Sequence, residues 1–186
     1  MGEKKDLRTC LAASPQVSKT SMDTLTQLEL FRQNLPEKPY CTNRVGDAGY
    51  SLVRPKAIAE RYRYIQHNHP NSRTWMVYDV DRSTSVFDWQ DRGAPPPNII
   101  ATNLENGHSH LFYGLEEPVH LNHESRVNPI RYHAAVDVAL SQKLDADPGY
   151  VGLLSKNPLR DDSWYVQTFQ PWSYSLGWLA DYLDLG

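Results

Sequence analysis

A short apolar run that ends on two carboxylates constrains this chain more than any other feature. Residues 75–78 (Trp-Met-Val-Tyr) have the character of a buried strand, and Asp79 and Asp81 follow directly. Because residues two apart in a strand point to the same face, both side chains should project together. Two carboxylates held this close repel, and a divalent cation would relieve that repulsion. An isolated Asp-X-Asp pattern can equally cap a turn, so this pair alone is a weak signal.

The segments around this strand predict an α+β domain with a mixed or antiparallel sheet and flanking helices. Asp23 is the expected N-cap of the first helix, and Asn128 with Pro129 the expected start of the longest. No glycine-rich phosphate loop follows a strand, which disfavours Rossmann and P-loop folds. Helices are expected at 23–34, from Pro55 toward His69 with Ile58, Tyr62 and Ile65 on one face, from Asn128 to before Pro148, and at 176–183. Strands are expected at 75–78, at 99–101 and 110–113 joined by a turn at 105–107, at 150–154 and at 164–169.

The composition describes one globular domain. The 186 residues are 40% hydrophobic, and no apolar stretch is long enough to cross a bilayer. Cys10 and Cys41 are too few for a disulfide framework or a cysteine zinc cluster, which favours a cytoplasmic protein. The net charge of -3 argues against coating nucleic acid through bulk electrostatics, although a local basic groove remains compatible with it. Residues 1–22 lack apolar periodicity and are expected to be a flexible lead.

Two histidines form a second candidate constellation. His108 and His110 should share one face of a strand that begins after a glycine turn, and imidazoles can bind metal or phosphate. The alternative is a pair of partly exposed histidines at a sheet edge.

A third carboxylate would complete a two-metal arrangement for phosphoryl displacement. Asp147 and Asp145 are the candidates, since both follow the longest predicted helix. Lys156 and Asn157 offer a cationic and an amide donor suited to a triphosphate, or they decorate a turn before Pro158.

Four segments together resemble the motifs of the archaeo-eukaryotic primase superfamily. They are residues 75–81, 106–113, 147–150 and 156–158, in the order of that superfamily. Within it the chain looks most like the replication initiators of theta-replicating colicin-type plasmids, including the segments 35–41 and 54–56. The likeness runs from about Leu35 to the end of the chain.

The resemblance implies a primase-polymerase core in residues 23–186 that uses Mg²⁺ or Mn²⁺. It implies that Asp79, Asp81 and Asp147 hold the metal and that His110 contacts the triphosphate. It further assigns nucleotide contacts to Lys156, Asn157 and, as a weaker extension, Arg160. His108 stands where the family commonly has a small hydroxyl residue, and it is a further candidate contact.

The implied activity is initiation of plasmid DNA replication by a bacterial, cytoplasmic primase. Such an enzyme makes a short primer from nucleoside triphosphates. Its expected partners are a single-stranded DNA template, plasmid origin DNA and a host DNA polymerase. Initiators of this kind also carry a C-terminal helical origin-binding portion, which we expect this chain to lack because it ends soon after residues 178–183.

Three other functions compete with this interpretation. A rolling-circle or relaxase-like endonuclease would use His108, His110 and a nucleophilic Tyr132, but would leave the two strand-end carboxylates without a necessary role. A glycosyltransferase could bind a sugar nucleotide through Asp79 and Asp81. A noncatalytic DNA-binding module could have the primase-like shape without the activity.

Overall fold

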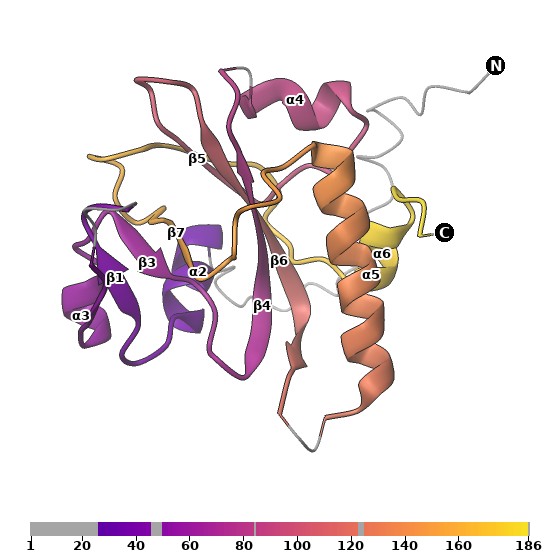
Figure 1. Cartoon of the computed structure of the whole chain (residues 1–186), viewed down its shortest axis with the longest axis horizontal. Coiled ribbons are helices and arrows are strands. Elements are labelled where there is room, and N and C mark those ends of the chain that lie inside the picture. Colours follow the sequence, from indigo (N-terminus) through magenta and orange to yellow (C-terminus); the bar gives the residue numbers. More distant parts are fainter. Residues whose placement is uncertain (1–25, 46–49, 84, 123–124, 186) are drawn as a thin grey trace, which may run out of the picture.

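The computed structural model describes residues 26–45, 50–83, 85–122 and 125–185 (Figure 1). The expected flexible lead, Cys10 and the predicted cap Asp23 lie outside these ranges. The first described helix is capped instead by Thr26, which forms a capping box with Glu29. The helices are α2 (Gln27–Asn34), α3 (Lys56–Ala59), α4 (Ser85–Asp91), α5 (Val127–Leu144) and α6 (Leu176–Ala180). The strands are β1 (Tyr40–Thr42), β2 (Leu52–Val53), β3 (Tyr64–Gln66), β4 (Ser72–Val80), β5 (Ile99–Thr102), β6 (Ser109–His120), β7 (Leu154–Lys156) and β8 (Tyr165–Thr168).

The strands form two four-stranded sheets, which confirms the α+β prediction. The larger sheet has the order β4-β6-β5-β8 and the smaller β2-β1-β3-β7, and all their strand pairs are antiparallel. The predicted antiparallel pairing around the 105–107 turn is that of β5 with β6. Within the described ranges, no helix has both the length and the apolar character that crossing a membrane requires.

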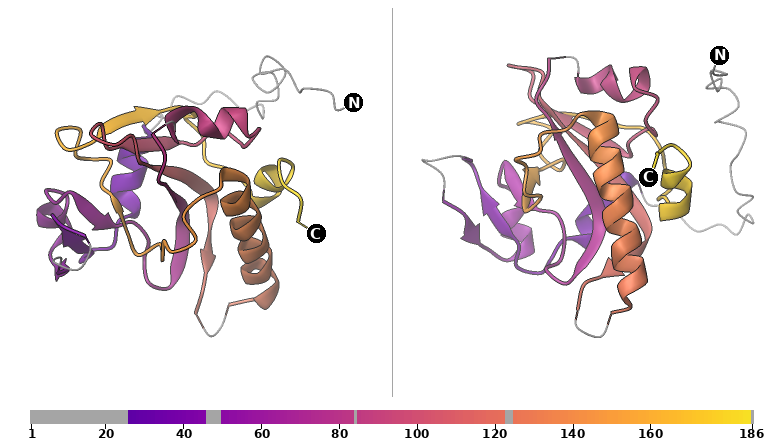
Figure 2. Two further views of the ribbon diagram at one scale, coloured as in Figure 1. Left: turned by 45° about the horizontal axis from the view of Figure 1, so that its top comes forward. Right: turned by 45° about the vertical axis from the view of Figure 1, so that its right-hand side comes forward.

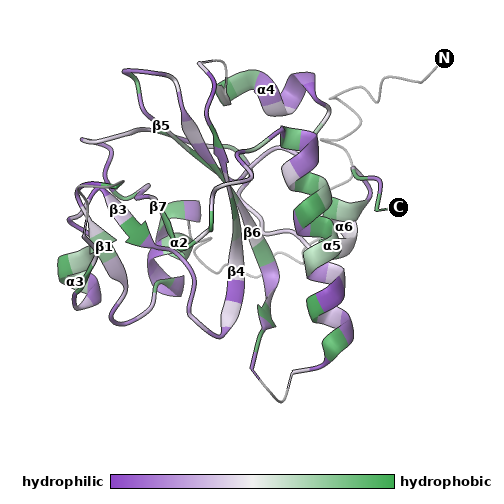
Figure 3. Cartoon of the chain, viewed as in Figure 1, coloured by the Kyte–Doolittle hydropathy of each residue, from purple (hydrophilic) through white to green (hydrophobic). Residues whose placement is uncertain are grey.

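The larger sheet is the middle layer of the molecule. Alternate residues of β4 and β6 point to opposite faces, so Tyr78 and Leu111 pack under α5 and α6, whereas Trp75 and Phe112 pack with Phe31 of α2. Figures 1 and 2 show α5 and α6 along one side of this sheet and the smaller sheet on the other. The hydropathy of α5 changes around the helix (Figure 3), as the predicted apolar stripe requires, and Val136, Leu140 and Leu144 are buried. Between the two sheets, Cys41 and Ile65 of the smaller one pack in a buried cluster with Trp75 and Phe112 of the larger one.

The predicted helix from Pro55 is wrong beyond its first turn. Helix α3 ends at Ala59, and Ile65 lies in β3 rather than on a helix face. The side-chain amide of Asn157 donates to the carbonyls of Glu60 and Tyr62, at 3.0 and 2.9 Å, and so satisfies groups that a longer helix would have used. Pairing of β3 with β1 and β7 then outweighs the helical spacing of the apolar residues.

Three other predicted boundaries are also corrected. Helix α5 is capped by Arg126 rather than Asn128, and Pro129 lies in its first turn, where a missing N–H costs nothing. The predicted strand at 150–154 begins only at Leu154, because Gly152 has a φ of +67° and interrupts the extended backbone. Helix α6 ends at Ala180 rather than at residue 183.

Candidate metal and nucleotide site

The register of β4 and β6 brings the two strand-end carboxylates against the two histidines. Asp79 lies opposite His110 in the antiparallel pair, with 3.2 Å between Oδ1 and Nε2. Two residues beyond Asp79, Asp81 Oδ1 lies 2.8 Å from His108 Nδ1. Asp79 and Asp81 are two residues apart, and so are His108 and His110, so all four side chains lie on one face of the sheet. That face is the one directed toward the smaller sheet.

Asp147 joins this group from the loop that follows α5. Its backbone N–H donates to the carbonyl oxygen of Asp79 at 2.8 Å, which fixes the loop against the edge of β4. Asp79, Asp81 and Asp147 each offer a carboxylate oxygen, and these oxygens lie within 4.8 Å of one another. Three hard oxygen donors on one patch suit Mg²⁺ or Mn²⁺, so the residues present fit a divalent cation.

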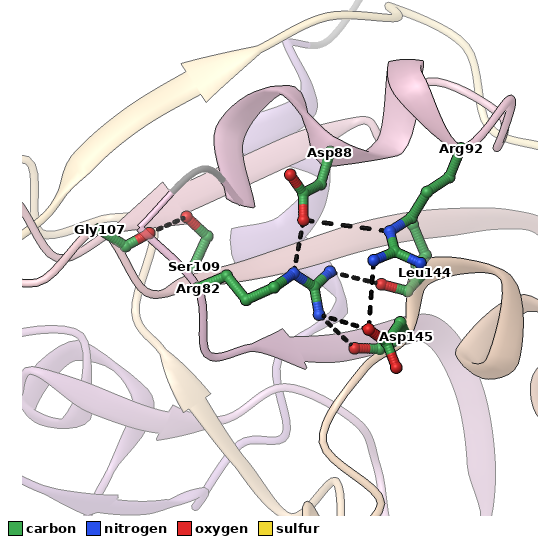
Figure 4. A network of polar contacts seen from close by, with 7 residues as sticks. All are labelled: Arg82, Asp88, Arg92, Gly107, Ser109, Leu144 and Asp145. Carbon is green, nitrogen blue, oxygen red and sulfur yellow. Dashed lines mark hydrogen bonds and ion pairs between the residues drawn. The ribbon is translucent and has the colours of Figure 1, made fainter.

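Asp145, the other candidate, is held apart from these carboxylates. It is the C-cap of α5, in the left-handed conformation with φ of 50°, and its carboxylate pairs with Arg82 at 3.2 Å and Arg92 at 3.1 Å (Figure 4). Arg82 also donates to the carbonyls of Leu144 and Asp145, at 2.7 and 2.6 Å, and pairs with Asp88 of α4 at 2.5 Å. Arg82 directly follows Asp81 in the chain. Arg82 therefore connects the end of β4 to the end of α5. Asp145, the last residue that it contacts there, lies two residues before Asp147.

The smaller sheet contributes Lys156, the last residue of β7. The Lys156 ammonium lies 3.5 Å from Asp79 Oδ1, and its side chain is 8% exposed. The backbone N–H of Lys156 donates to His110 Nδ1 at 3.1 Å. His110 Nδ1 is therefore an acceptor, so the imidazole proton lies on Nε2, from which it is donated to Asp79. Burial lowers the pKa of His110, although the hydrogen bond to Asp79 acts in the opposite direction. The lowered pKa favours this neutral form.

The same contacts control the charge of Asp79. Burial alone would raise the pKa of this carboxyl, but the hydrogen bond and charge of His110, together with the Lys156 ammonium, lower the pKa to about 2. Because the pKa in the folded state lies below the ordinary value, ionised Asp79 stabilises the fold above about pH 4, and this contribution is lost as the pH falls toward 2.

We expect this loss to be visible in metal-free buffer. The free energy of unfolding, measured by urea titration with EDTA present between pH 5 and 2, should fall more steeply for the native chain than for Asp79→Asn. The exposed Asp91→Asn serves as the control and should follow the native curve. Parallel curves for the native chain and Asp79→Asn would contradict the depressed pKa.

A cavity of about 770 Å³ opens between the two sheets at these residues. Its volume lies within the range of ligand pockets, which is roughly 300–1,000 Å³. Tyr150 lies over His110, with ring centroids 5.0 Å apart, and narrows the cavity. The lining includes the three carboxylates, both histidines and Lys156, and also residues that sequence reasoning missed, namely Thr42, Arg44, Tyr64, Asn103 and Tyr150.

Three residues singled out in the sequence do not line this cavity. Asn157 is fully buried, and its amide is committed to the backbone of residues 60, 62 and 159. Arg160 pairs with Asp162 through two contacts of 2.5 and 2.6 Å. Tyr132 lies on α5 twelve residues before Leu144, which is about 18 Å along the helix at 1.5 Å per residue. Tyr132, the nucleophile that the endonuclease alternative assigned, is therefore not among the residues that line the cavity with His108 and His110.

The turn that carries His108 depends on Gly107. This glycine has a φ of +77°, and a Cβ on it would lie 2.6 Å from backbone atoms of Ser83. Gly93 has a similar φ of +60°, but a Cβ there would meet nothing within 4 Å.

The two glycines therefore form a matched pair for substitution. We expect Gly93→Ala to lower the free energy of unfolding by about 1 kcal/mol, because only the left-handed backbone is penalised. Gly107→Ala should cost at least about 2 kcal/mol more, because the backbone of the 81–83 segment must also move. Chemical denaturation of both variants measures the difference, and equal losses would show that the close approach to Ser83 is unimportant.

The comparisons with known proteins agree with this fold. The structure is similar to the AEP domain of the primase-polymerase of cyanophage S-2L, with a TM-score of 0.58 and 15% sequence identity over 87% of this chain and 96% of that one. This likeness establishes a primase-polymerase fold. The Replicase family model matches residues 34–183, and the chain belongs to the Replicase family. No curated protein matches the chain. Family and fold together support a replication-related, primase-like function.

Proposed function

We propose that this domain is the catalytic primase of a plasmid replication initiation protein. Its reaction would join nucleoside triphosphates into a short primer on single-stranded DNA. The observation that carries the proposal is the group of three carboxylates, Asp79, Asp81 and Asp147, within 4.8 Å of one another beside the buried pair His110 and Lys156. A plasmid setting, with origin DNA and a host polymerase as partners, rests on the resemblance of residues 35–41 and 54–56.

The reaction transfers a nucleotidyl group. The 3'-hydroxyl oxygen of one nucleotide forms a bond to the α-phosphorus of the next, and the bond from that phosphorus to the pyrophosphate breaks. Pyrophosphate leaves, and the hydroxyl proton passes to water. Two Mg²⁺ or Mn²⁺ ions held by Asp79, Asp81 and Asp147 would supply charge stabilisation at the attacking and leaving oxygens.

The other residues of the cavity bind and position. Lys156 would neutralise the triphosphate of the incoming nucleotide, because its ammonium is buried beside the metal-holding face with a single carboxylate at 3.5 Å. His110 keeps Asp79 oriented and ionised. It would contact the triphosphate only if its Nε2 gave up the hydrogen bond to Asp79. His108 is about one-third exposed and, with Asp81, lines the outer part of the cavity. Asn157 holds the backbone that precedes β3 and so anchors the end of β7, where Lys156 lies.

Primer synthesis tests the proposal directly. Labelled nucleoside triphosphates are incubated with single-stranded DNA, Mg²⁺ or Mn²⁺, and either the native chain, Asp79→Asn or the control Asp91→Asn. Product from the native chain and the control, absent with Asp79→Asn, supports the two-metal primase. Failure of the folded native chain to bind nucleoside triphosphates in the presence of metal would overturn it.

A further inference from the structure

A second cavity, of about 520 Å³, meets the first at Asp79 and Asp147. It is lined by residues of β4 and α5 and by the loop that carries Asp147 and Tyr150. Asp79 and Asp147 therefore belong to the lining of both cavities. The reaction proposed above needs two nucleotides, and the first cavity accounts for only one of them.

Three residues that line the second cavity carry buried nitrogen atoms without hydrogen-bond partners in the described part of the chain. His67 and Trp75 are 2% and 1% exposed, and both line the cavity. Among the described residues, His67 Nδ1, Trp75 Nε1 and His133 Nε2 have no partner. Buried polar atoms are rarely left unpaired, and their gathering in one cavity points to a polar ligand.

The backbone of β4 offers a further donor and acceptor. β4 is an edge strand, and its free edge is partly occupied: Asn68 binds the N–H and carbonyl of Trp75, and Asp147 binds the carbonyl of Asp79. By the alternation of an antiparallel strand, the N–H and carbonyl of Val77 point to the same edge. Val77 lines the cavity, and in the described part of the chain no bond to its edge groups is recorded. An adjacent donor and acceptor match the hydrogen-bonding edge of a nucleobase.

A cation lies at the end of the cavity far from the carboxylates. Arg73 has no salt bridge within the described residues, where its guanidinium donates to the carbonyl of Ser72. Like His67 and His133 it lines this cavity, and its charge adds to the effect of burial in lowering the pKa of both imidazoles. The one carboxylate of α5 that lines the cavity, Asp137, accepts a hydrogen bond from Tyr78 at 2.8 Å. Arg73 is thus the cationic side chain that this cavity offers to an anionic group such as a triphosphate.

We infer that the second cavity binds the initiating nucleotide, the one whose 3'-hydroxyl is extended. Its base would pair with the edge of Val77, its 3'-hydroxyl would face Asp79 and Asp147, and its 5'-triphosphate would extend toward Arg73. Arg73 lies six residues before Asp79 in β4, a distance of roughly 20 Å at 3.3 Å per residue. A nucleoside triphosphate and the arginine side chain together can span this distance. This inference rests on the proposed function and adds the location of its second substrate.

The test separates initiation from extension. Arg73→Gln is compared with the native chain and with Arg131→Gln, a change at an exposed residue of α5 outside both cavities. One assay measures the first dinucleotide formed from nucleoside triphosphates, and the other measures extension of an annealed primer. We expect Arg73→Gln to lower initiation at least tenfold more than it lowers extension. Equal losses in both assays, with unchanged thermal stability, would overturn the inference.

A binding measurement keeps the inference testable without catalysis. Each of the four ribonucleoside triphosphates is titrated into the native chain in EDTA, where the metal-dependent cavity is disabled. We expect one of them to bind the native chain and Arg131→Gln alike, and Arg73→Gln at least tenfold more weakly. An absence of binding, or binding indifferent to Arg73→Gln, overturns the second site. A native chain that binds in EDTA but neither initiates nor extends with metal contradicts the proposed function instead.

Discussion

Replacing Asp147 with asparagine is expected to reduce nucleotidyl transfer by roughly a thousandfold or more, because a charged ligand of the proposed metal centre becomes a neutral amide. The side chain keeps its size, and its amide oxygen can still accept the 2.8 Å hydrogen bond from the Gly149 N–H. The loop should therefore keep its conformation. Primer synthesis with saturating Mg²⁺ or Mn²⁺ measures the loss.

Asp145→Asn provides the matched control for this prediction. It changes the same residue type two positions earlier, but the carboxylate removed pairs with Arg82 and Arg92 and is 66% exposed. We expect a loss of transfer below about tenfold and a stability cost below about 1 kcal/mol, as for other exposed ion pairs. Equal losses for the two variants would mean that Asp147 acts through the loop rather than through metal binding.

The sequence predicted the centre of this site because its two main strands carry local signals. The apolar run before Asp79 marks β4 and the glycine turn before His108 marks β6, and α4 and β5 lie between them in the chain. A period of two indicates which side chains share a face within each strand, but the pairing of β4 with β6 was not predicted and comes from the structure. The position after the predicted long helix left both Asp145 and Asp147 open, and the hydrogen bond from the Asp147 N–H to the Asp79 carbonyl, which sets Asp147 against the edge of β4, comes from the structure.

The smaller sheet could not be predicted in the same way. Its strands are two or three residues long, too short to show a period, and β7 pairs with β3 across about 90 residues of chain. The position of Lys156 beside Asp79 is a consequence of that pairing, so the sequence supplied the residue type but not the contact. The buried amide of Asn157, which stops α3, is a long-range contact of the same kind. Tertiary hydrogen bonds here override local helical spacing.

Arg82 illustrates a positioning residue that no motif identified. Its guanidinium is 29% exposed and satisfies the carbonyls of Leu144 and Asp145 at the C-terminus of α5, where four carbonyls lack helical partners. It also joins Asp88 of α4 to the same helix end. Removing the guanidinium leaves these acceptors without their donor and loosens the connection between the end of β4 and the loop that carries Asp147.

Arg82→Gln should therefore affect both stability and catalysis. We expect the free energy of unfolding to fall by about 3 kcal/mol, which corresponds to roughly 6–12 °C in Tm. Transfer should fall by about ten- to a hundredfold at temperatures where the variant is folded, because Asp147 is no longer held in register with Asp79. Thermal melts and primer synthesis on the same preparation separate the two effects.

Arg92→Gln is the comparison that decides between positioning and simple charge. Arg92 pairs with the same Asp145 carboxylate at 3.1 Å, but no hydrogen bond from it to the carbonyls that end α5 is recorded in the described residues. We expect it to cost less than about 1 kcal/mol and to leave transfer within about twofold of the native rate. If Arg92→Gln lowers transfer as much as Arg82→Gln, the loss reflects the charge around Asp145. If only Arg82→Gln does, the guanidinium bridge between β4 and α5 sets the geometry of the three carboxylates.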